Sequence, residues 1–153
     1  MKKVLLVLTV ASAIVACNNS NDGKQTTAEP QTKADSLLHE VLEGHDVAMA
    51  AQMTKMKKAK EGVQQLIDSV SKLPSKANDA ISSYKEKLYN TLSDLTYADN
   101  AMNKWMNEFN YDSAKNNIQE RIKYLTDEKL KVDHVKDAML SSLQKADSLL
   151  KKP

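Results

Sequence analysis

The sequence predicts an all-α fold: an elongated antiparallel three-helix bundle, or coiled coil, that follows a cleaved lipoprotein signal and a flexible tether. Apolar residues recur three and four positions apart over most of residues 34–152, which is typical of helices that pack lengthwise. Only 3 glycines and 3 prolines occur in the 153-residue chain. No long stretch alternates apolar and polar residues as a strand does. These observations together favour helices throughout the folded part.

The first 16 residues have the features of an export signal. "MKK" supplies positive charge, and the apolar run "VLLVLTVASAIVA" is too short to span a bilayer as a permanent helix. The quartet "IVAC" at 14–17 resembles the lipobox of bacterial lipoproteins, whose cysteine is acylated on its sulfur before cleavage and on its new amine afterwards. The resemblance implies that residues 1–16 are removed and that Cys17 carries covalent lipid such as palmitate. An ordinary secretory signal with a chance cysteine is the alternative.

Residues 17–33 are predicted to connect this lipid to the folded part as a disordered tether. The segment "NNSNDGKQTTAEPQTK" contains no large apolar residue, so it buries too little surface to offset the entropy of ordering. Two or three acyl chains anchor a protein far more firmly than one chain does. Asn18 differs from the aspartate that is associated with inner-membrane retention in Gram-negative lipoproteins. We therefore expect a cell-envelope protein on the periplasm-facing outer membrane.

Charge and motifs argue against two classes of function. Removal of Lys2 and Lys3 with the signal leaves 20 basic side chains against 20 acidic ones. Arg121 is the only arginine, so a nucleic acid partner is not expected. The segment "HEVLEGH" at 39–45 spaces its histidines by six positions, which does not match the zinc-protease helix. Without a phosphate loop or a nucleophile elbow, we expect no enzymatic activity.

The first helix is predicted from its cap to a proline. Thr32 and Asp35 are spaced for an N-terminal cap, and Pro74 should end the helix. Between them one heptad register holds for about five repeats. Its positions are Leu38, Leu42, His45, Met49, Gln52, Met56, Ala59, Val63, Leu66, Val70 and Leu73.

Two further helices complete the predicted bundle. The second begins near Ser75 or Asn78 and ends within "NEFNYDS". The third is capped by Asp112 or Ser113 and runs to the terminal "KKP", whose lysines suit a helix C-terminus. Its stripe comprises Ile118, Ile122, Leu125, Val132, Met139, Leu143, Ala146 and Leu150. Long helices joined by short turns pack antiparallel to their neighbours.

The antiparallel register brings four informative side chains to one layer. If the first turn is centred near residue 75, His45 lies level with Trp105, and Met49 lies level with Met102. Here the segments "HD" at 45–46, followed by Met49, and "ADNAMNKWMNEF" at 98–109 resemble small uncharacterised lipoproteins of Bacteroidetes-type bacteria that are labelled viral A-type inclusion protein-like. That group tends to place its next methionine where this chain has Gln52. The resemblance implies a fold and a location in the cell, but no reaction.

The His and Met residues of this layer have two interpretations. His45, Met49, Met102 and Met106 offer imidazole and thioether ligands for a soft ion such as Cu(I) or Ag(I), and Trp105 could cover a bound cation. The stronger interpretation is an ordinary core, because methionine fills irregular interiors without any metal. In that case His45 would be satisfied by a hydrogen bond with Asp99 or Gln52. No other cofactor is expected.

Three polar residues fall on the predicted inward stripes: Gln52, Asp99 and Arg121. Asp99 and Arg121 either form a buried pair that aligns two helices or lie solvated at the edge of the seam. His134 and the lysines of "KMKKAK" at 55–60 are expected on the surface. The leading hypothesis is a membrane-anchored helical module that binds a protein partner or self-associates. The alternative is a soft-metal or small-ligand binder built around the layer of His45 and Trp105.

Overall fold

A computed structural model describes residues 32–73 and 79–151. The predicted signal peptide, Cys17 and the tether up to residue 31 lie outside the described residues, as does the predicted helix break at Pro74. The elements are α1 (Lys33–Ala51), η1 (Gln52–Met56), α2 (Lys57–Ser71), α3 (Asp79–Glu108) and α4 (Ile118–Leu150). The predicted all-α class is confirmed.

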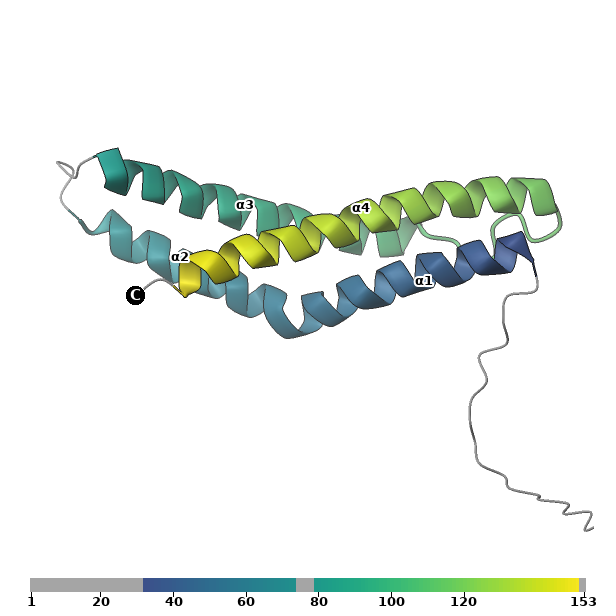
Figure 1. Ribbon diagram of the computed structural model, residues 1–153, viewed down its shortest axis with the longest axis horizontal. Helices are drawn as coiled ribbons and strands as arrows, with labels where there is room; N and C mark the ends of the chain where they lie inside the picture. The colour runs from purple at the N-terminus through teal and green to yellow at the C-terminus, as the bar shows by residue number, and fades with distance from the viewer. Residues whose placement is uncertain (1–31, 74–78, 152–153) are drawn as a thin grey trace, which may run out of the picture.

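The elements form a slender three-helix bundle (Figure 1). Segment α1, the short π-helix η1 and α2 make one continuous first arm, and α3 returns alongside it. Helix α4 packs along α1 and α3, and its C-terminal part also reaches α2. At 1.5 Å per residue, the 33 residues of α4 span about 50 Å. No helix within the described ranges is both long and apolar enough to cross a membrane.

The start of the first arm agrees with the predicted cap. Thr32 has extended backbone, and its hydroxyl oxygen accepts a hydrogen bond from the Asp35 N–H at 3.1 Å. The same hydroxyl donates to the Asp35 carboxylate at 2.7 Å. This exchange satisfies an N–H group that has no partner inside the helix.

The start of the third helix is later than predicted, so the expected caps at Asp112 and Ser113 are wrong. The N-cap is Asn117, whose side-chain oxygen accepts hydrogen bonds from the backbone N–H groups of residues 119 and 120. Residues 111–116 form a turn in which Ala114 has a φ of 54°. The Arg121 guanidinium stabilises this turn by donating to the carbonyls of Tyr111 at 2.9 Å and Ser113 at 2.7 Å.

The first arm contains a π-helical segment that the heptad pattern did not predict. At its start the Gln52 N–H donates to the carbonyls of both Ala48 and Met49. A π-segment accommodates one residue more than a regular helix, so the face that points inward shifts by one position. Before η1 the buried positions are 34, 41, 44, 48 and 51, and after it they are 56, 59, 63 and 67.

This shift corrects the predicted register. The single heptad frame holds at Met56, Ala59 and Val63, but before η1 its members are only partly buried. At the far end Leu73 is 48% exposed. In the third helix Ile118 is 52% exposed and Leu150 is 38% exposed, because both lie at the ends of α4, where fewer neighbours cover them. The central stripe of α4 is buried largely as predicted, at Leu125, Val132, Met139, Leu143 and Ala146.

Candidate functional site

A layer of ring contacts crosses the bundle at Trp105. The His45 ring on α1 contacts Trp105 on α3, with ring centroids 5.7 Å apart. Trp105 stacks on Phe109 at 4.9 Å, and Phe109 stacks on Tyr124 of α4 at 6.2 Å. The predicted pairing of His45 with Trp105 is therefore confirmed, and the contact series links all three arms of the bundle.

A buried carboxylate anchors this layer, and sequence reasoning missed it. The Trp105 indole N–H donates to Glu128 at 2.9 Å, and Glu128 is only 4% exposed. Lys131 donates to the other carboxylate oxygen at 2.7 Å, and this hydrogen bond raises the pKa of the lysine. A signal was present, because Glu128 occupies the inward position between Leu125 and Val132 at spacings of three and four.

The methionines of the proposed metal set belong to the core. Met102 is fully buried, and Met49 and Met106 pack against the same apolar cluster. The expected partners of His45 were wrong, since its Nδ1 pairs with the adjacent Asp46 carboxylate at 2.9 Å. Asp46 is largely exposed, so this histidine reaches solvent along the edge of α1. Within residues 32–73 and 79–151, no group of three His, Cys, Asp or Glu side chains is placed to hold a metal.

Gln52 and Asp99 form a polar cluster with a partner that was not predicted. The Gln52 amide donates to the Asp99 carboxylate at 2.6 Å, and the Lys60 ammonium forms an ion pair with the second oxygen. Burial alone would raise the pKa of Asp99, but the hydrogen bonds from Gln52 and Lys60 outweigh it and hold this pKa below its ordinary value. The cluster joins both sides of the π-helical segment to α3.

The predicted burial of Arg121 is confirmed, but its predicted pair with Asp99 is wrong. Its guanidinium is about as buried as the core, with 9% exposure, and it binds the carbonyls of the turn before α4 instead of Asp99. The reason is register, because residue 121 lies in the first turn of α4 whereas Asp99 lies opposite the middle of the first arm. The surface prediction for the lysine run also fails at Lys60, which is partly buried by its pair with Asp99.

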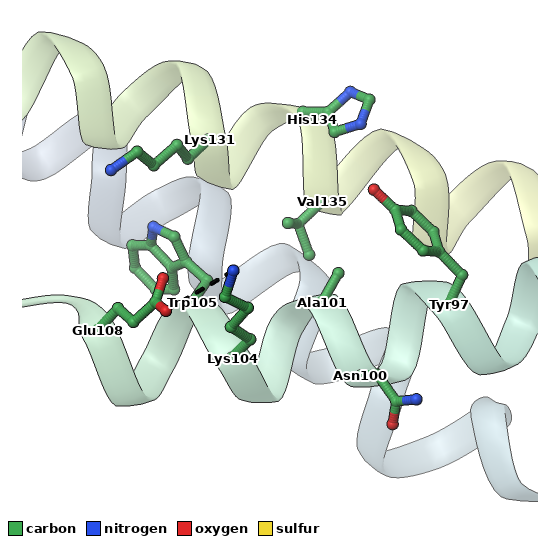
Figure 2. A pocket seen from close by; sticks show the side chains of 9 residues that line it. All are labelled: Tyr97, Asn100, Ala101, Lys104, Trp105, Glu108, Lys131, His134 and Val135. Atoms are coloured by element: carbon green, nitrogen blue, oxygen red, sulfur yellow. Dashed lines mark ion pairs between the residues drawn. The ribbon is translucent and has the colours of Figure 1, made fainter.

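A solvent-facing groove runs along the seam between α3 and α4, and we call it the seam groove. Its main hollow has a volume of about 420 Å³. The lining residues are Tyr97, Asn100, Ala101, Lys104, Trp105, Glu108, Lys131, His134 and Val135 (Figure 2). A second hollow of about 210 Å³ shares Tyr97 and His134 with the first and adds Asp94, Ala138, Ser141, Ser142 and Lys145. The two hollows together make one elongated depression.

The middle of the seam groove is uncharged and shallow, while its ends are charged. Figure 2 shows Tyr97 reaching from α3 toward α4, and Val135 and Ala101 facing each other across the seam. Tyr97 is 57% exposed although it is aromatic. Lys104 pairs with Glu108 at 3.7 Å at one end, and Lys145 pairs with Asp94 at 2.7 Å at the other. Exposed tyrosine above small apolar residues is typical of protein-binding surfaces.

The opposite face, between α1 and α4, carries a chain of ion pairs. Lys129 lies 2.6 Å from Asp133 and 3.7 Å from Glu40, and Lys136 lies 2.6 Å from the other oxygen of Asp133. Hydrogen bonds from both lysines lower the pKa of Asp133. Pairs this accessible to water contribute little stability individually. The two helices approach closely at Gly44. A Cβ atom added there would lie only 3.2 Å from the Val132 side chain.

No protein-family model, curated protein or solved structure matches this chain. The seam groove is the principal candidate site because of its size and lining.

Proposed function

We propose that this protein is a lipid-anchored module of the bacterial cell envelope that binds a protein partner through the seam groove. The observation that carries the proposal is the exposed Tyr97 above an uncharged hollow that is flanked by charges at both ends. Large aromatic side chains on a surface supply contact area at low cost in conformational entropy.

The buried carboxylates of the bundle support a binding role for the protein in preference to a catalytic one. Glu128 is held by Trp105 and Lys131, and Asp99 is held by Gln52 and Lys60. A carboxylate that already accepts two hydrogen bonds serves structure, since a general base needs access to a substrate proton. These two carboxylates therefore serve the fold, and the groove offers shape and charge to a partner.

The membrane part of the proposal rests on the sequence "IVAC" and on Cys17 within it. Growth with an alkyne analogue of palmitate should label the wild-type protein, and Cys17→Ser should abolish the label. Labelling of Cys17→Ser at the wild-type level would refute the anchor, whatever the groove binds.

The interaction part is tested by a photo-crosslinking residue placed at Tyr97 in the full-length protein in its own membrane. The matched control carries the same residue at Tyr89, which is 49% exposed on α3 and lies outside the groove. We expect a cross-linked product from position 97 and none from position 89. Equal yields from both positions, or no product from either, would refute binding through the groove.

A second function is favoured by the contact between His45 and Trp105 at 5.7 Å. Met49 and Met106 are partly buried and pack against the core cluster that includes Trp105. As an alternative we propose binding of Cu(I) or Ag(I) at this layer. Competition titration with a Cu(I) chelator should show sub-micromolar affinity that is lost in His45→Ala and Met102→Leu. Absence of Cu(I) uptake by the wild-type protein would exclude this alternative.

A further inference from the structure

The charges of the seam groove are arranged so that the groove is complementary to itself. On α3 the order along the groove is Asp94, then Tyr97 and Ala101, then Lys104 and Glu108. On α4, which runs antiparallel to α3, Lys145 lies at the Asp94 end and Lys131 lies at the Lys104 end. The middle of the groove lies around Tyr97 and His134. One end carries Asp94 and Lys145, and the other end carries two lysines and one glutamate.

The distances along the helices make this arrangement symmetric. Asp94 and Lys104 lie on opposite sides of residue 99, each about 7.5 Å from it at 1.5 Å per residue. Glu108 lies farther out, about 13.5 Å from residue 99, whereas the Lys145 ammonium lies beside Asp94, with which it pairs at 2.7 Å. A two-fold rotation about an axis through the middle, perpendicular to the helices, exchanges the two ends. Such a rotation brings positions of opposite charge together.

We propose that a second copy of this chain occupies the seam groove, in an antiparallel two-fold dimer. The Lys104–Glu108 pair of one copy faces the Asp94–Lys145 pair of the other, with Lys104 against Asp94, so the symmetry forms each contact twice. Near the axis, Tyr97 of each copy packs over the small side chain of Ala101 in the opposite groove. A parallel arrangement is disfavoured, because the ammonium groups of Lys104 and Lys131 in one copy would lie close to those in the second copy and repel them.

The surface that each copy contributes to this dimer is small. The groove from Asp94 to Glu108 is about 21 Å long, and two helices side by side are about 20 Å wide, which gives on the order of 400 Å² per copy. Interfaces of this size are weak and transient, so we expect a dissociation constant on the order of 10–100 µM in solution. The inference rests on the proposed interaction role and names its partner. The proposed membrane anchor confines both copies to one surface and raises the effective concentration of the second copy.

Sedimentation equilibrium tests the pairing in solution. The sample is the chain from residue 17 onward with Cys17→Ser, which retains every described core residue from Ala34 to Ala146. Asp94→Lys places a lysine opposite Lys104 of the second copy and should weaken the dimer at least tenfold, and Lys104→Asp should do the same by opposing two aspartates. A mixture of the two variants should restore dimers. In the heterodimer, each of the two contacts joins a lysine to an aspartate.

Two controls separate this effect from misfolding and from net charge. Circular dichroism should show unchanged helix content in each variant, including Asp94→Lys, which loses its pair with Lys145. Asp137→Lys makes the same charge change on an exposed position of α4 outside the groove and should leave the dimer intact. A monomeric wild-type protein at about ten times the expected dissociation constant, or variants that do not recover on mixing, would overturn the proposal.

Cross-linking from position 97 in the membrane distinguishes this inference from the broader role. A product with twice the mass of the chain, whose peptides all derive from this protein, supports the second copy. A product that contains a different protein overturns the dimer and leaves the interaction role standing. No product from position 97 overturns both.

Discussion

Deletion of Met53 should be tolerated although this residue lies in the middle of a long helix. Met53 is 79% exposed and belongs to the π-helical segment, which holds one residue more than a regular helix. Without it, the step from Ala51 to Met56 shortens from five positions to four, which is a regular helical spacing. Residues 56–71 then keep their orientation toward α3 and α4. We expect the free energy of unfolding to change by no more than about 1 kcal/mol.

Deletion of Gln64 is the matched comparison, because this residue is also exposed but lies in regular helix. Every later residue of α2 would turn by about 100°. Ile67, now 3% exposed, would leave the core, and Asp68 would enter its place. Loss of one buried isoleucine costs about 1.5–3 kcal/mol, and the misplaced carboxylate adds to that cost. We expect a total of roughly 3–5 kcal/mol.

Urea unfolding followed by circular dichroism measures both deletions under the same conditions. The midpoint for deletion of Met53 should lie close to wild type, while deletion of Gln64 should lower it strongly. Equal losses from the two deletions would refute the explanation that the π-segment stores a removable residue. A loss confined to the Met53 deletion would refute it as well, and would show that the segment itself stabilises the arm.

Three further predictions follow from individual contacts. Glu128→Ala removes the acceptor of the Trp105 indole N–H and should lower the free energy of unfolding by about 2–3 kcal/mol in urea titrations; a change below about 0.5 kcal/mol would contradict this. Ala114→Gly relieves the left-handed backbone at a φ of 54° and should stabilise the fold by up to about 1 kcal/mol, seen as a higher Tm. Because the pKa of Asp99 is lowered in the folded state, its ionic contribution is complete above the unfolded pKa of about 4 and is lost as pH falls through the folded value. The stability difference between wild type and Asp99→Asn should therefore be largest above about pH 5 and shrink toward pH 2, and a difference independent of pH would contradict the ionic role.

Local patterns predicted most of the architecture. The cap at Thr32, the all-α class, the antiparallel order and the pairing of His45 with Trp105 follow from residue spacing and turn position alone. The same spacing failed at the π-helical segment, because a heptad frame assumes one helical pitch along the whole arm. It also failed at the start of α4, where helix was predicted from Asp112 or Ser113 onward. Arg121 instead stabilises a turn at these residues.

The candidate site was less predictable than the fold. The metal hypothesis selected His45, Met49, Met102 and Met106 because their side chains can bind soft ions. In the structure His45 pairs with Asp46, and the three methionines pack in or against the core. The seam groove depends on Tyr97 and His134, which occupy positions beside the core stripes and carry no motif. Such positions become a surface only when two helices are placed next to each other.

The sequence by itself determined that the bundle is helical and antiparallel, because periodicity and caps act locally and short turns connect neighbouring helices. Tertiary structure alone decided which charges meet. The contacts of Glu128 with Trp105 and of Lys60 with Asp99 depend on how far each helix slides and turns against its neighbour. A single residue accommodated in η1 changes that rotation for half of the first arm. Packing of all three arms selects this arrangement, since no arm buries its apolar stripe alone.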